Sequence, residues 1–148
     1  MKFNESKSVT ATVSFYFEAI RMANILIVED DALVRTLLDQ FLTSKGYTVT
    51  LASNGREGLS SIQQKRPDLM ITDMIMPEMD GMELIEIVHK ADPDLPIISM
   101  SGGMRDVPLN ILPLAQQIGS YRSFQKPVSL VNLLCATKEL LGESLSLV

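Results

Sequence analysis

Two short apolar runs in this chain end on acidic residues, and this pattern limits the folds open to it. Residues 25–28 are followed by Glu29 and Asp30, and residues 69–72 are followed by Asp73. A continuous apolar run of this length is typical of a strand buried on both faces of a parallel sheet. Because the carboxyl ends of parallel strands lie at one edge of the sheet, we expect the three carboxylates to gather there.

Helix-like and strand-like segments alternate along the rest of the chain. We predict further strands at 47–52, 96–100 and 120–125, and helices at 32–45, 55–65, 81–90, 111–118 and 129–141. Apolar residues spaced three and four apart indicate the helices, and glycine or proline indicates several of their ends. This order favours an α/β fold, a doubly wound five-stranded parallel sheet with helices on both faces.

The length and composition fit one domain. The chain has 148 residues, of which 46% are hydrophobic and 21% are charged, as in an ordinary globular protein. We expect residues 1–22 to be a flexible N-terminal extension and residues 23–148 to be the domain itself. Alternating apolar residues within 9–17 leave a second interpretation open, in which the extension is a strand that docks on a partner.

Charge, hydropathy and cysteine content exclude several classes of function. A net charge of −5 argues against direct binding to nucleic acid, which requires a basic surface. No apolar stretch approaches the roughly 20 residues that cross a bilayer, and the start of the chain does not indicate a signal peptide. The single Cys135 has no partner for a disulfide or a thiolate metal site. We therefore expect a reduced, cytoplasmic protein that does not associate with membranes.

Polar residues at the ends of the later strands add to the acidic group. Ser101 follows the fourth strand and Lys126 the fifth, so both should lie near the three carboxylates. Crowded carboxylates repel one another unless a divalent cation neutralises them, and ligands that are all oxygen favour Mg²⁺ or Mn²⁺. With a metal and a lysine beside it, a carboxylate can accept a phosphoryl group. We interpret Asp73 as the acceptor and a metal ligand, and Lys126 and Ser101 as its partners on the phosphoryl oxygens.

Four motifs in this order resemble a known family. They are ILIVEDD at 25–31, ITDMIMPEMDG at 71–81, SMSG at 99–102 and Lys126-Pro127. Residues 24–141 are thereby similar to the receiver domain of two-component response regulators. The resemblance implies a flavodoxin-like strand order 2-1-3-4-5, phosphorylation of Asp73 by a sensor histidine kinase or a histidine phosphotransfer protein, a requirement for Mg²⁺, and an unknown downstream protein. A cis peptide bond before Pro127 is a further hypothesis.

The resemblance also implies individual roles. Asp30 is similar to the direct metal ligand, Glu29 to the acid that acts through metal-bound water, and Ile75 to the residue that lends the metal a backbone carbonyl. Gly102 is similar to the small residue that lets the phosphoryl group approach. Ile75 and Gly103 border the path of attacking water, and neither side chain can orient that water. We therefore hypothesise that the phosphoryl group is lost slowly.

We predict a stand-alone receiver, which is a signalling module rather than an enzyme. Two other functions stay open. A docking module that works without phosphorylation would share the fold. A Mg²⁺-dependent phosphohydrolase also uses a strand-end aspartate, but it usually needs a second acid two residues later, where this chain has Ile75.

The chain departs from the receiver pattern at one position. Ser123 lies three residues before the lysine, where many receivers have an aromatic residue. Phe124 should face the opposite side of the sheet, because side chains alternate along a strand. Any switching is then expected to rest on the loop at 102–110.

Overall fold

The computed structural model describes residues 22–102, 116 and 119–145. It contains one parallel sheet of order β2-β1-β3-β4-β5, as predicted. The strands are β1 (Asn24–Val28), β2 (Thr48–Ala52), β3 (Leu69–Asp73), β4 (Ile97–Ser101) and β5 (Arg122–Gln125). The helices are α2 (Ala32–Ser44), α3 (Gly55–Gln64), α4 (Gly81–Ala91) and α6 (Leu130–Leu140). The predicted extension up to residue 21, the loop at 103–110 and the helix at 111–118, apart from residue 116, lie outside the described residues.

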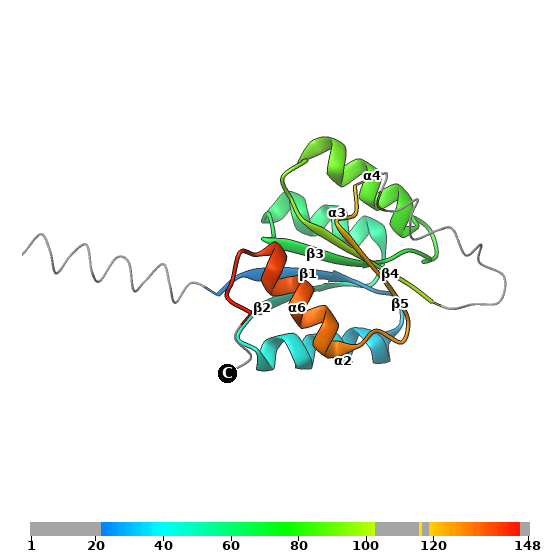
Figure 1. Cartoon of the computed structure of the whole chain (residues 1–148). Coiled ribbons are helices and arrows are strands. Elements are labelled where there is room, and N and C mark those ends of the chain that lie inside the picture. Colours follow the sequence, from blue (N-terminus) through cyan, green and yellow to red (C-terminus); the bar gives the residue numbers. More distant parts are fainter. Residues whose placement is uncertain (1–21, 103–115, 117–118, 146–148) are drawn as a thin grey trace, which may run out of the picture.

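The sheet separates two layers of helices. Figure 1 shows α2 and α6 on one face and α3 and α4 on the other. Side chains alternate along β1, so that Ile25 and Ile27 pack towards α2 and α6, whereas Leu26 and Val28 pack towards α3 and α4. All five residues of β1 are buried, which explains why residues 25–28 form a continuous apolar run rather than an alternating pattern.

Local sequence determines where the helices begin near the sheet edge. The Asp31 carboxylate accepts hydrogen bonds from the backbone N–H groups of Leu33 and Val34, and so caps α2 directly after the acidic pair. Asp80 caps α4 in the same way through Glu83 N–H. Both caps lie in loops that leave the carboxyl ends of strands, so they help to position the candidate site.

The strand bounds differ from the prediction at β5, which begins two residues late. The Ser120 hydroxyl donates to the Arg122 carbonyl at 2.7 Å, while the Tyr121 N–H still donates to the Ile97 carbonyl of β4 at 2.9 Å directly before the strand begins. Alternation along β5 is as predicted, because Phe124 packs against the α2 and α6 layer while the Ser123 hydroxyl meets that of Ser99 at 2.7 Å. No helix within the described residues is long and apolar enough to cross a membrane.

Candidate functional site

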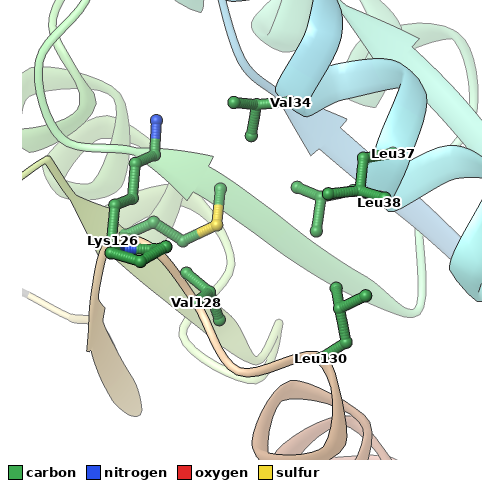
Figure 2. A pocket seen from close by; sticks show the side chains of 8 residues that line it. Val34, Leu37, Leu38, Lys126, Val128 and Leu130 are labelled. Carbon is green, nitrogen blue, oxygen red and sulfur yellow. The ribbon is translucent and has the colours of Figure 1, made fainter.

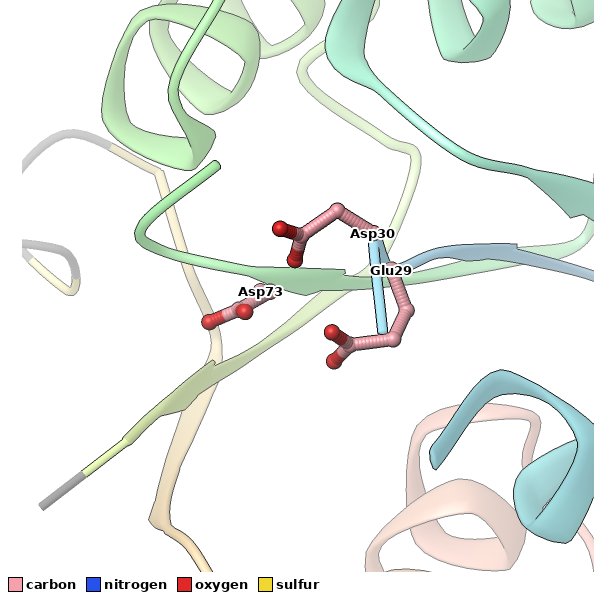
Figure 3. A group of neighbouring side chains, drawn as sticks. All are labelled: Glu29, Asp30 and Asp73. Carbon is pink, nitrogen blue, oxygen red and sulfur yellow. The ribbon is translucent and has the colours of Figure 1, made fainter. Parts of the chain in front are cut away.

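The carboxyl ends of β1 and β3 bring three acidic side chains together. Glu29, Asp30 and Asp73 each offer one carboxylate oxygen, and these atoms lie within 4.8 Å of one another. Figure 3 shows the carboxylate groups of all three residues directed to the same side. The arrangement follows from the register, in which Val28 pairs with Thr72 and the next residues therefore leave the sheet side by side.

Lys126 joins the acidic group from the end of β5. Its Nζ lies 2.6 Å from Glu29 Oε2 and 3.0 Å from Asp73 Oδ2. The peptide bond between Lys126 and Pro127 is cis, as hypothesised. The backbone N–H of Lys126 donates to the Ser101 carbonyl at 2.7 Å, which ties this segment to the end of β4. One lysine therefore contacts two of the three carboxylates.

Burial makes the charge of this group costly. Glu29 is fully buried and Asp73 is 5% exposed, whereas Asp30 is exposed at the rim. Burial raises the pKa of Glu29 to about 7, although hydrogen bonds from Lys126 and the Asp31 N–H act in the opposite direction. Burial alone would lower the pKa of Lys126, but its hydrogen bonds to Glu29 and Asp73 outweigh that effect and raise it. The lysine thus stays charged and one ammonium group faces an excess of negative charge.

The acidic group opens into a cavity of about 430 Å³. The lining includes most of the predicted site residues, together with three that were not predicted to belong to the site, Asp31, Met76 and Pro77. Ile75 is partly exposed, and its backbone N–H lies 3.4 Å from Asp73 Oδ1. Gly102 also lines the cavity. The lining residues are Glu29, Asp30, Asp31, Asp73, Ile75, Met76, Pro77, Gly102 and Lys126.

Ser101 lies at the end of β4, next to the cavity, but it is not among the lining residues. It is buried, and its hydroxyl is directed to the Gly102 carbonyl at 3.4 Å. Its contact with a phosphoryl oxygen therefore remains a prediction. Gly103, predicted to border the path of water, lies outside the described residues.

The donor set suits a hard divalent cation. All the candidate ligand atoms are oxygens. Three carboxylates against one lysine also leave a net negative charge that a cation would neutralise. Glu29, Asp30 and Asp73 would hold such an ion, with the backbone carbonyl of Ile75 as a further candidate ligand. An anionic group that approached Asp73 would meet both this ion and the ammonium group of Lys126.

Comparison with known proteins identifies the family of this chain. Residues 25–138 match the response regulator receiver domain. The chain belongs to this family. It is 36% identical to the transcriptional regulatory protein GlrR of Escherichia coli over 124 residues, which cover 82% of this chain but 27% of that protein. It is 31% identical to the sporulation initiation phosphotransferase F of Bacillus subtilis over 117 residues, which cover 79% of this chain and 92% of that protein.

Solved structures place the fold in the same family. The CheY-like receiver domain protein of Methanospirillum hungatei superposes with a TM-score of 0.75 at 32% identity, covering 82% of this chain and 94% of that one. A receiver domain from Clostridium thermocellum gives the same TM-score at 28% identity, covering 82% and 95% of the two chains. Receiver domains are signalling modules of two-component systems. This chain spans about a quarter of the length of GlrR, and the match does not extend to the rest of that protein.

Proposed function

We propose that this chain is a Mg²⁺-dependent phosphoryl acceptor, which takes a phosphoryl group on Asp73 from a phosphohistidine of a kinase or phosphotransfer protein. The observation that carries the proposal is the place of the Asp73 carboxylate, at the floor of an open cavity, grouped with Glu29 and Asp30 and 3.0 Å from Lys126 Nζ. Membership of the receiver family supports it. We further propose that the phosphorylated form signals by altered binding to a downstream protein.

The residues divide the work of the transfer. An oxygen of Asp73 bonds to phosphorus while the bond from phosphorus to the donor imidazole breaks and leaves its electron pair on the ring nitrogen. Lys126 already reaches Asp73 Oδ2, and in the product it pairs with a phosphoryl oxygen. Bound Mg²⁺ supplies charge neutralisation at the phosphoryl oxygens.

A second, apolar cavity next to the site suggests where the donor protein docks. It has a volume of about 360 Å³ and shares Lys126 with the acidic cavity. Figure 2 shows aliphatic side chains of α2 facing those of the segment after Lys126. Leu37, which lines this cavity, is 53% exposed, Leu33 on the same helix is 83% exposed, and Val131 is exposed on α6. Exposed aliphatic residues around a cavity favour a protein partner, and one docked here would reach Asp73.

Phosphorylation by a small donor tests the acceptor role. The full chain with Mg²⁺ and acetyl phosphate should gain about 80 Da in intact mass, the mass of one phosphoryl group. Asp73→Asn should abolish this gain, whereas Asp39→Asn, on the exposed surface of α2, should not. Omission of Mg²⁺ should also abolish it. If the wild-type protein gains no mass with this donor or with any purified histidine kinase, the chain is a docking module that works without phosphorylation.

Substitution on α2 tests the docking surface separately. Leu33→Glu and Leu37→Glu add charge at the apolar cavity and should slow transfer from a phosphorylated kinase or phosphotransfer protein by about fivefold or more, since an interface residue of this kind contributes about 1 kcal/mol or more. The same variants should react with acetyl phosphate at the wild-type rate, because their side chains do not line the acidic cavity. Equal transfer from the protein donor in wild type and variants would show that the donor docks elsewhere.

A further inference from the structure

Arg35 lies in the first turns of α2, and its side chain turns back towards the acidic group. Its Nη1 donates to the backbone carbonyl of Glu29 at 2.7 Å and lies 3.4 Å from that of Asp30. These are the two residues that follow β1 in the loop before α2. Arg35 was not indicated by the sequence reasoning, because it is a lone basic residue in a helical pattern.

The loop that Arg35 contacts is held at several points. The Glu29 N–H donates to the Ala52 carbonyl at 3.0 Å, and Glu29 Oε1 accepts from the Asp31 N–H at 3.0 Å. Asp31 in turn caps α2. The hydrogen bonds to the two carbonyls come from the side chain of Arg35, so this residue determines how the backbone of the exposed Asp30 is presented to the cavity.

Arg35 and Lys126 contact the acidic residues in different ways. Lys126 binds the carboxylates of Glu29 and Asp73, and thus occupies oxygens that an incoming cation would use. Arg35 binds carbonyl oxygens and leaves the carboxylates free. It can therefore orient ligand residues without competing for the ligand atoms, which is how outer residues commonly tune metal sites.

Arg35 also lies near the neighbouring loop after β2. The hydrogen bonds from the Ser53 backbone and hydroxyl lower the pKa of Glu57, and the positive charge of Arg35 contributes in the same direction. Glu57 lies in the first turn of α3 and accepts from the Ser53 N–H at 2.8 Å. The contacts that fix the guanidinium group are nevertheless those to the carbonyls of Glu29 and Asp30, in the loop that leaves β1.

We propose that Arg35 is a positioning residue for divalent cation binding, which holds the Glu29 and Asp30 backbone so that their carboxylates meet that of Asp73. This inference rests on the proposed function, because it assumes that the acidic group binds Mg²⁺. The charge of Arg35 by itself would oppose a cation. A role in positioning and a role through charge therefore predict opposite changes in Mg²⁺ affinity when the residue is neutralised.

Calorimetric titration of the full chain with MgCl₂ tests the proposal, together with the melting temperature in EDTA. Arg35→Gln should weaken Mg²⁺ binding by about tenfold, the size typical of outer-residue substitutions at metal sites, while the melting temperature in EDTA stays close to that of wild type. Arg35→Lys retains the charge and a donor and should recover part of the affinity. Arg56→Gln removes the same charge from the exposed start of α3 and should bind as wild type does.

Other values of the Mg²⁺ affinity or of the melting temperature would each refute one part of the proposal. Equal or tighter Mg²⁺ binding by Arg35→Gln would overturn the positioning role, and tighter binding would show that the residue acts through its charge alone. A lower melting temperature with unchanged affinity of the folded protein would reduce Arg35 to a structural residue. If Arg35→Gln does not fold, Arg35→Lys decides instead: its ammonium group is expected to replace the guanidinium contacts only in part, so wild-type affinity in this variant would also overturn the positioning role. Absence of Mg²⁺ binding by the wild-type protein would refute the metal site itself, and both proposals with it.

Discussion

Replacement of Glu29 by glutamine should remove a pH dependence from the stability of the metal-free protein. Glu29 is fully buried, and burial raises its pKa to about 7 from its ordinary value of 4.5. The unfolded chain therefore releases this proton at lower pH than the folded chain does. Between these two pKa values the folded state binds more protons, so the free energy of unfolding falls as pH rises.

The size of the effect follows from the pKa shift. Each pKa unit corresponds to about 1.4 kcal/mol, so the full shift amounts to about 3 kcal/mol between pH values well below and well above the two pKa values. From pH 5.5 to pH 8.5 the expected loss from Glu29 is about 2 kcal/mol, because part of the change lies below pH 5.5. This expected loss is an upper limit, because the neighbouring Lys126 can respond to the change in charge of Glu29.

Urea unfolding followed by circular dichroism, in EDTA at pH 5.5 and pH 8.5, measures the effect. The difference in free energy of unfolding between Glu29→Gln and wild type should grow by about 2 kcal/mol in favour of the variant as the pH rises. Comparison of differences removes the contributions of other titrating groups that the two proteins share. The reasoning would be refuted if this difference in free energy of unfolding were the same at both pH values. It would also be refuted if the difference moved in favour of the wild-type protein as the pH rises.

Three further predictions concern residues around the site. Gly81→Ala should destabilise the protein by about 3 kcal/mol in urea unfolding, because a Cβ atom there would lie 1.9 Å from the Asp73 carbonyl oxygen; wild-type stability would refute this. Tyr47→Phe should cost about 1 kcal/mol, because it removes the 2.5 Å hydrogen bond to Glu143, and a neutral result would show that this contact does not contribute. Glu78→Gly should stabilise the protein by up to about 1 kcal/mol and so raise its melting temperature slightly, because Glu78 has a φ of 70° in the turn after β3, a conformation that glycine adopts more easily. A lower melting temperature would contradict this.

Local patterns were sufficient to predict the elements and the place of the acidic residues. β1 and β3 are buried on both faces, so their sequences are continuous apolar runs that cannot be read as alternating surface strands. The order of strands and helices then predicted a parallel sheet, and in such a sheet Asp73 and Lys126 must leave the same edge. The start of β5 was predicted two residues too early, because the hydrogen bond of the Ser120 hydroxyl to the Arg122 carbonyl leaves no apolar pattern in the sequence.

The three-dimensional arrangement decided what surrounds these residues. The sequence by itself determined the fold class, the edge of the sheet that carries the site and the three carboxylates, because these follow from short-range periodicity and from the geometry of parallel strands. Only the tertiary structure showed that Arg35 reaches the carbonyl of Glu29 and that Lys126 contacts both Glu29 and Asp73. Contacts of this kind depend on side-chain directions and on packing between elements distant in sequence, for which a linear pattern carries no signal.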